Sequence, residues 1–511
     1  MEKDLKIIKK YYKDALNKAK ISLNLNEVDQ SLNYLKLAST IGWLCPFKYN
    51  FGDNEIEEIL KKISLNIRFQ EYEATEKIIL YCTSIRDFGA LVQQYLYNLP
   101  DVTLIVHDKI IQSENRDILK FVNDKQIKYH YLGDAESFSE KIKYMNNIVQ
   151  ELKPKKVFLH FDPNDVFGAT YFIKLKHIAY FINASDHLFW IGKNCFSTII
   201  DFRKYGYWFT RSIRKINNVN HIVLPFYPIL PKENFRDEKI IPKNKIIGIS
   251  GGNLYKYNQD PDLLFFKIII KLLKKNPNFY FILCGSGDST LIRKLIKKNN
   301  IDERFKIYGF RRDFSEIIKR SDIYFNSYPM AGGLAPLYAL NHKVPVVSIA
   351  FDVRNGDSLE EFFEIDNFKS LENIYELESF TDKLINDEAY RIKIINKQKL
   401  KNLNNIYFKE TLKNIVEDKV TFKLNLEKNN FNFNYDLNLK TTLSEKNAFN
   451  NIIYWNFIYN INNVNFFIKF SEYLKTIKSL KNPRIILVLK IHITLLGLKN
   501  LFTSFRAINK V

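Results

Sequence analysis

The chain has 511 residues, too many for one core of ordinary domain size, and its 46% apolar and 26% charged residues exclude wholesale disorder. Lys and Arg number 77 and Asp and Glu 56, a net charge of +21 that indicates an anionic partner: nucleic acid, a phosphate-rich substrate or a membrane surface. The N-terminus is charged from its second residue and lacks the apolar core of a signal peptide, so we expect a cytoplasmic protein.

The cysteines indicate a reducing compartment. They lie far apart beside apolar residues, with no Cys-x-x-Cys pair and no nearby histidine to complete a zinc site, which predicts buried thiols at Cys45, Cys82, Cys195 and Cys284. The longest nearly apolar stretch, 485–498, contains Lys490 and His492 and is shorter than the roughly 20 residues that span a bilayer. We therefore predict no transmembrane helix.

The first 70 residues show helical spacing of apolar side chains, with examples at Ile8, Tyr12, Leu32 and Ile59. Two paired helices could begin a repeat array, but no similar unit follows at a fixed period. We therefore predict a small helical cap over 1–70.

Two sets of short apolar runs follow, each alternating with helical stretches, a pattern typical of a parallel sheet wrapped in helices. The first set lies at 77–82, 102–107, 156–161, 178–183 and 221–226. The second set lies at 245–250, 279–285, 305–310, 322–327 and 344–349, after a charged stretch at 232–245 that we interpret as a linker. The sequence thus predicts an α/β protein with two Rossmann-like domains, at 71–235 and 236–418, that face a ligand-binding cleft.

A C-terminal extension over 419–511 has a different composition. Residues 420–465 contain 14 Asn among 46 residues, and residues 466–511 contain nine Lys or Arg against the single Glu472. The basic and apolar side chains of 466–511 predict a peripheral contact with anionic lipid on the inner face of the membrane. A helical module that packs on the body, with its lysines in solvent, is the alternative.

The segment 322–348 carries the strongest functional signal. A strand is expected to end near Ser327, a helix to begin at Ala335, and Gly332 and Gly333 to form the turn between them. Glycines let an anion approach the backbone N–H groups and the start of a helix. A tight turn between a strand and a helix that binds no ligand would have the same sequence.

This segment resembles the donor domain of the GT-B glycosyltransferases, which has a proline, a glycine-rich turn and a helix before a P-V-V strand; here these are Pro329, Gly332, Gly333 and 345–347. The stretch 248–285 is similar to the donor-domain opening of protein O-GlcNAc transferases and related bacterial enzymes. The matching residues are Asn253, Tyr255, Lys256, Pro261, Pro277 and Asn278. The runs 183–192 (NASDHLFWIG) and 201–203 (DFR) are similar to bacterial GT-B enzymes acting on surface glycans.

The resemblance implies a donor site. Lys256 would meet the diphosphate, Gly332 and Gly333 would cradle it, and Arg311 and Arg312 would neutralise phosphate or read the nucleobase. A solvated loop would explain Arg311 and Arg312 equally well, and a solvated surface lysine is the alternative for Lys256.

On the other domain, His187 follows a predicted strand and adjoins Asp186, so it is a candidate general base for a sugar hydroxyl, with the carboxylate orienting it. A histidine bonded within the domain is the alternative. Asp260 and Asp262 spell D-x-D, but they lie at a predicted helix start, where Asp caps free N–H groups. We therefore expect no metal site.

Two positions depart from the resembled families. The bacterial enzymes have a Gly-Gly-His-Thr turn after the first strand, where this chain keeps only Gly89. The donor helix commonly has a carboxylate that bonds the ribose hydroxyls, where this chain has Tyr338. Both departures put donor choice, or activity itself, in question.

The sequence as a whole predicts a metal-independent glycosyltransferase without a cofactor. It would move a sugar from a nucleotide diphosphate sugar, UDP-linked by expectation, to a hydroxyl of a bacterial surface glycan precursor, free or lipid-linked. A catalytically impaired GT-B protein that acts as an assembly partner would explain the two departures. A GT-B epimerase would need several cleft carboxylates, and a nucleic-acid binder would need a recognised motif; the sequence shows neither.

Overall fold

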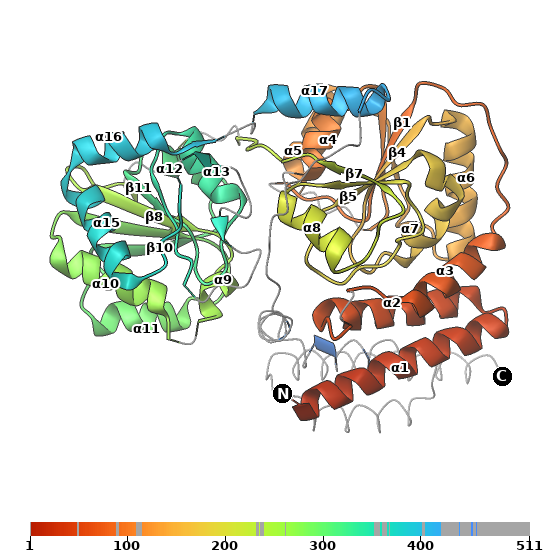
Figure 1. Cartoon of the computed structure of the whole chain (residues 1–511), viewed down its shortest axis with the longest axis horizontal. Helices are drawn as coiled ribbons and strands as arrows, with labels where there is room; N and C mark the ends of the chain where they lie inside the picture. Colours follow the sequence, from red (N-terminus) through yellow and green to blue (C-terminus); the bar gives the residue numbers. More distant parts are fainter. Residues whose placement is uncertain are drawn as a thin grey trace, which may run out of the picture.

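The computed structural model describes residues 2–48, 51–87, 91–108, 115–230, 235, 240–260, 262–351, 358–359, 365–366, 368–400, 404–420, 439, 451–452 and 456. Figure 1 shows two α/β domains side by side, with a helical cap against the first of them.

The cap consists of α1 (Glu2–Asn24), α2 (Val28–Leu44) and α3 (Asn54–Leu65). Asp53 accepts a hydrogen bond from the Glu55 N–H at the start of α3, and the Tyr12 hydroxyl of α1 donates to the same carboxylate at 2.6 Å. Apolar side chains of all three helices share one core with the first sheet, so the cap is packed onto that domain. Helical spacing correctly predicted these three helices.

The first domain is built on a seven-stranded parallel sheet of order β3-β2-β1-β4-β5-β6-β7. Its strands are β1 (Ile78–Cys82), β2 (Val102–Val106), β3 (Tyr129–Tyr131), β4 (Lys156–His160), β5 (Ala179–Asn183), β6 (Thr198–Asp201) and β7 (Asn220–Val223). The helices between them are α4 (Leu91–Asn98), α5 (Arg116–Asp124), α6 (Phe138–Leu152), α7 (Val166–Tyr171), the 3-10 helix η1 (Phe172–Ile178) and α8 (Lys204–Ser212). The direction of strand order reverses between β1 and β4, which is where ligands bind in such sheets.

The second domain has a five-stranded parallel sheet of order β10-β9-β8-β11-β12, which reverses between β8 and β11. Its strands are β8 (Ile246–Gly251), β9 (Phe279–Cys284), β10 (Phe305–Gly309), β11 (Ile323–Phe325) and β12 (Val346–Val347), and β13 (Ile365–Asp366) pairs with β14 (Lys399–Leu400) separately. The helices are α9 (Tyr255–Asn258), α10 (Leu264–Lys275), α11 (Thr290–Lys298), α12 (Phe314–Lys319), α13 (Leu334–Asn341), α15 (Ile374–Asn386) and α16 (Glu388–Lys397).

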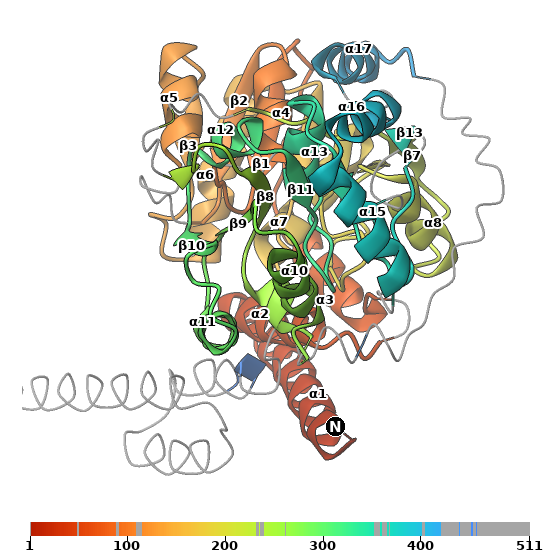
Figure 2. The ribbon, with the colours of Figure 1, turned by 90° about the vertical axis from the view of Figure 1, so that its left-hand side faces the viewer.

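The chain returns to the first domain after α16. Helix α17 (Asn405–Val416) lies beside α4 in both ribbon views (Figures 1 and 2). Phe408 and Leu412 are fully buried in the core that α4 shares with β1 and β2. The second domain was predicted to span 236–418, which includes this helix. In the structure the helix packs on the first domain instead.

The predicted fold class is confirmed: both domains are Rossmann-like, the arrangement of GT-B proteins. Each of the ten predicted apolar runs overlaps a strand, whereas β3, β6, β13 and β14 were not predicted. All four cysteines are buried free thiols. No helix among the described residues is long and apolar enough to cross a membrane. Gly89, half of the linker 232–245 and the tail 466–511 lie outside the described residues.

Candidate functional site

A cavity of about 380 Å³ opens at the carboxyl ends of β8, β9 and β10 and at the start of α13. Its lining includes all six residues predicted to bind a donor: Lys256, Arg311, Arg312, Gly332, Gly333 and Tyr338. Among the described residues that line it, three are cationic and none is acidic. The cavity lies at the reversal point of the second sheet and is chemically suited to an anion.

Two glycines let the backbone come close at the cavity floor. Gly252 and Gly285 both have positive φ (144° and 157°). A Cβ on Gly285 would stand 1.7 Å from the Gly252 carbonyl oxygen, so only glycine fits there. The loops after β8 and β9 are therefore in direct backbone contact at the cavity.

Lys256 lies on α9, directly after β8, and is half-buried at the cavity wall. Its ammonium donates a hydrogen bond to the Ala331 carbonyl at 3.3 Å, which places the charge beside the turn that contains Gly332. The structure thus brings together two segments, 75 residues apart, that the resemblance assigned to one diphosphate site.

The two arginines already have carboxylate partners. Arg311 donates to both oxygens of Asp313, at 2.8 and 2.7 Å. Arg312 reaches the first domain and donates to Asp87 and to Asp117, each at 3.1 Å. These partners offset part of the arginine charge that faces the cavity.

The glycine turn differs in one respect from the expectation of bare N–H groups. Asn326 follows β11 directly, and its side-chain oxygen accepts a hydrogen bond from the Gly332 N–H at 2.9 Å. This bond fixes the conformation of the turn. Gly333 is the N-cap of α13. Gly332 therefore shapes the turn, while the start of α13 supplies the partial positive charge.

Tyr338 lines the cavity from α13 and is only 6% exposed. Burial raises the pKa of its hydroxyl well above the ordinary value, so the side chain is neutral. The position where related donor sites carry a carboxylate is thus occupied by an uncharged ring that packs with Leu337 and Ile249 in the domain core.

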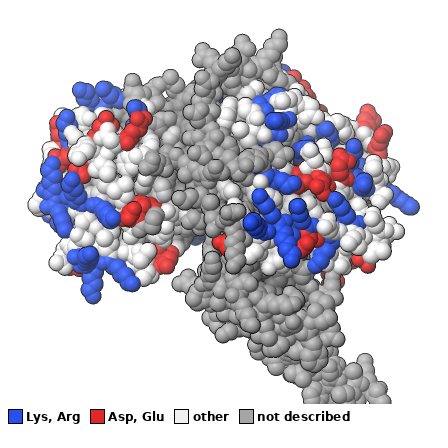
Figure 3. Space-filling model, turned by 60° about the horizontal axis from the view of Figure 1, so that its bottom comes forward, with Lys and Arg blue, Asp and Glu red and all other residues white. Residues whose placement is uncertain are grey.

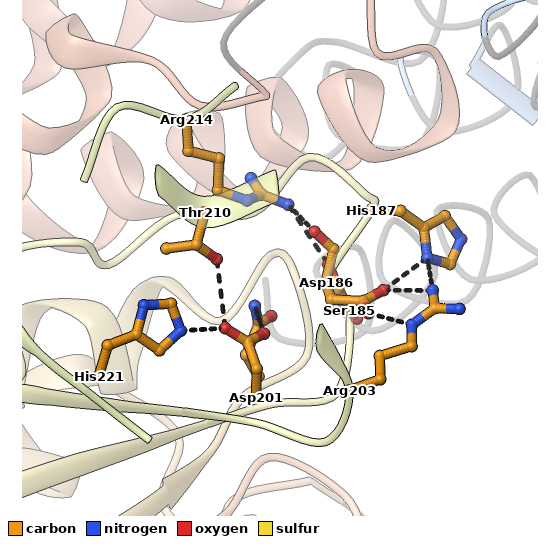
Figure 4. A network of polar contacts seen from close by, with 9 residues as sticks. Ser185, Asp186, His187, Asp201, Arg203, Thr210, Arg214 and His221 are labelled. Atoms are coloured by element: carbon orange, nitrogen blue, oxygen red, sulfur yellow. Dashed lines mark hydrogen bonds and ion pairs between the residues drawn. The ribbon is translucent and has the colours of Figure 1, made fainter. Parts of the chain in front are cut away.

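His187 and Asp186, the predicted catalytic pair, lie on the first domain and are not among the residues that line the cavity of the second domain. The His187 Nδ1 lies 2.8 Å from Asp186 Oδ1, and the side chain is 22% exposed while Asp186 is fully buried (Figure 4). Arg203 holds the carboxylate with two donors, Nε and Nη2. The predicted pairing of His187 with Asp186 is therefore present.

The charge of Asp186 is fixed by these contacts. Burial alone would raise the pKa of the carboxyl, but the Arg203 guanidinium and the hydrogen bonds from Arg203 and His187 together hold it well below its ordinary value. The same Nδ1 faces two groups: the ionised Asp186 carboxylate at 2.8 Å, which favours a proton on Nδ1, and the Arg203 Nη2 donor at 3.4 Å. In the tautomer that donates to Asp186, Nε2 is the basic nitrogen.

The sequence did not predict the wider polar network behind this pair. Arg214 Nη2 donates to the backbone carbonyls of Ser185 at 3.3 Å and Asp186 at 3.0 Å, which fixes the loop that carries His187 (Figure 4). Asp201, at the end of β6, contacts His221 and accepts from Asn183 at 2.7 Å. The run 201–203 was noted only for its resemblance. The charged residues at its two ends were the available sequence signal, and the structure shows that they are buried beside 183–187.

Asp260 accepts from a free N–H at the start of α10, as predicted, although the N-cap residue of this helix is Leu263. The Asp260 carboxylate accepts hydrogen bonds from the Leu264 N–H at 2.6 Å, where α10 begins, and from the Asp262 N–H at 2.9 Å. No cluster of three or more His, Cys, Asp or Glu suited to a metal ion occurs in the described part of the chain.

We expect Asp260→Ala to lower the free energy of unfolding by about 1 kcal/mol, because the first turn of α10 loses its side-chain acceptor. Asp262→Ala, which keeps its backbone donor, is the matched control, and thermal unfolding measures both.

Chelation with EDTA should leave nucleotide binding by the wild type unchanged. Loss of that binding, restored by a divalent cation, would show that the D-x-D carboxylates hold a metal.

Residues 244–362 match the family described as "Glycosyl transferases group 1". This range contains the whole cavity lining on the second domain. A comparison with curated proteins finds no match.

Several solved structures are similar in outline. Anabaena Alr3699/HepE, in complex with UDP and glucose, has 14% identity and a TM-score of 0.48 over 67% of this chain and 99% of its own. The lipopolysaccharide outer core galactosyltransferase WaaB has 12% identity and a TM-score of 0.47 over 67% and 100%. The pneumococcal O-GlcNAc transferase GtfA, in complex with UDP and GlcNAc, has 16% identity and a TM-score of 0.39 over 54% and 60%.

Proposed function

We propose that the protein is a glycosyltransferase that binds a nucleotide diphosphate sugar, UDP-linked by expectation, in the cavity of the second domain. The observation that carries this proposal is the charge of the cavity: three cations, a helix start and no acidic residue in the described lining, at the reversal point of the sheet. The family match over 244–362 covers the same residues.

In this proposal the first domain supplies the acceptor side. His187 Nε2 would remove a proton from the acceptor hydroxyl, and Asp186, fixed by Arg203, would orient the imidazole. The second domain would stabilise the charge that develops on the departing diphosphate. The acceptor is proposed to be a bacterial surface glycan precursor, free or lipid-linked, and no metal or cofactor takes part.

Calorimetric titration with uridine, UMP and UDP tests the donor site. Affinity should rise from UMP to UDP, because the second phosphate adds a charge that meets Lys256 and the start of α13. Equal affinities for the three ligands, or no binding of UDP at millimolar concentration, would contradict the proposal.

Tyr338 favours one alternative, a catalytically impaired GT-B protein that acts as an assembly partner. If the missing carboxylate normally bonds the ribose hydroxyls, Tyr338→Glu should tighten UDP-sugar binding about tenfold, since one charge-assisted hydrogen bond is worth roughly that factor. Tyr338→Phe, which keeps the buried ring, should bind as the wild type does. Calorimetry decides: if neither the wild type nor Tyr338→Glu binds any nucleotide sugar, the assembly-partner function takes the place of the enzyme.

Peripheral contact of 466–511 with anionic lipid stays a proposal, since these residues lie outside the described part of the chain. Each basic residue near such a surface contributes about 1 kcal/mol, so a truncation before residue 466 should pellet less with vesicles containing phosphatidylserine than the full chain does. Equal pelleting of both forms would exclude the tail as the lipid-binding segment.

Figure 3 shows that Lys and Arg also gather on the second domain, where α10 and α11 lie.

A further inference from the structure

The first domain has a cavity of its own at the reversal point of its sheet. It measures about 230 Å³ and is lined by residues that follow β1, β2 and β4, together with α2 of the cap and the start of α6. This is the place in the first domain that corresponds to the donor cavity in the second. The cap therefore forms one wall of a pocket at the position where an open parallel sheet binds its ligand.

A buried histidine lies in the wall of this pocket. His107, 8% exposed, stacks on Phe167 with ring centroids 5.1 Å apart and an angle of 5° between the ring planes. Its Nε2 lies 3.0 Å from the Lys141 ammonium and its Nδ1 3.3 Å from Asp108 Oδ1. An ammonium can only donate, so Nε2 is the acceptor in the contact with Lys141.

Carboxylates outnumber ammonium groups in the lining of this pocket, which contains Lys36 and Lys141 together with Asp29, Asp108, Glu136 and Asp165. The pKa of Lys141 is lowered first by burial and then by the nearby Lys36, while Asp108, Asp165 and Asp29 oppose this lowering. The excess of carboxylates disfavours an anionic ligand, whereas an uncharged ligand with many hydroxyl groups finds both donors and acceptors.

The pocket therefore offers ammonium donors, a carboxylate acceptor and the side chain of Asn33 above a wall that contains Phe138 and Phe167. Its size is below the range of drug-sized ligands and suits a single ring. We infer that this pocket binds one uncharged sugar ring of the acceptor, and that Asn33 and Lys36 of the cap contact its hydroxyl groups. This inference rests on the proposed transfer to a glycan and assigns the cap a part in recognising it.

Saturation-transfer NMR with methyl glycosides of glucose, galactose, mannose and N-acetylglucosamine tests the pocket without knowledge of the full acceptor. At least one glycoside should bind the wild type, and Lys36→Met should weaken that binding about tenfold, because the ammonium donor is lost while the aliphatic stem stays. Asn33→Ala, at an exposed position, is the second variant. Lys62→Met, an exposed lysine of α3 outside the pocket, is the matched control.

The same titration is repeated with saturating UDP. A glycoside signal that persists with UDP, is retained in Lys62→Met and is reduced in Lys36→Met and Asn33→Ala supports the inference. It is overturned if no glycoside binds the wild type, if both pocket variants bind as the wild type does, or if UDP displaces the glycoside completely. Glycoside binding by a chain that fails to bind UDP would uphold the pocket and contradict only the donor site.

Discussion

Lys256→Ala is expected to weaken UDP binding roughly ten- to hundredfold, because a charge-assisted hydrogen bond to phosphate contributes about 1.5 to 3 kcal/mol. The effect follows from the position of the Lys256 ammonium, which donates to the Ala331 carbonyl beside the glycine turn. Calorimetry with UDP measures it.

Two further variants separate charge from packing. Lys256→Met keeps the half-buried stem and should lose as much affinity as the alanine variant. Lys267→Ala, an exposed lysine of α10 away from the cavity, should bind as the wild type does. Unchanged affinity in Lys256→Ala and Lys256→Met would remove this residue from the binding site.

His187→Ala is expected to lower transfer about 10²- to 10⁴-fold, the usual contribution of a general base, while UDP affinity stays unchanged. The base acts on the acceptor hydroxyl in the first domain, and His187 does not line the donor cavity. Product analysis by mass spectrometry gives the rate, and calorimetry gives the affinity.

The pH profile gives a second readout for His187. A base acts in its unprotonated form, so the rate of the wild type should fall as pH decreases, and the variant should lose this acid limb. Asp186 stays ionised throughout, since Arg203 holds the pKa of its carboxyl low. His177→Ala, at an exposed position on η1, is the control. Full turnover in His187→Ala would assign the base to another group.

Sequence patterns predicted the elements that have strong local signals. Buried parallel strands such as 279–284 are continuous apolar runs, and their pattern identifies them without knowledge of their neighbours. β3 has only three residues, none of them fully buried, and it lies at the edge of the sheet, so its pattern is weak. β6 has only four residues, and the segment 201–203 at its end was noted for its resemblance to bacterial GT-B enzymes and not as part of a strand.

The sites show the same division. Lys256 and the glycine turn were found because each belongs to a local motif, although the contact between them spans 75 positions. Arg203 was not predicted as the partner of Asp186, because the loops after β5 and β6 meet only in the folded sheet. The return of α17 to the first domain is likewise a tertiary contact that helical periodicity cannot specify.

A crystal structure of the full chain with UDP tests the central claim most directly. We expect the diphosphate in the cavity of the second domain, within hydrogen-bond reach of Lys256 Nζ and of the backbone N–H groups at the start of α13, with the ribose near Tyr338. A nucleotide bound anywhere else, or bound in this cavity with its diphosphate away from Lys256 and α13, would contradict the account.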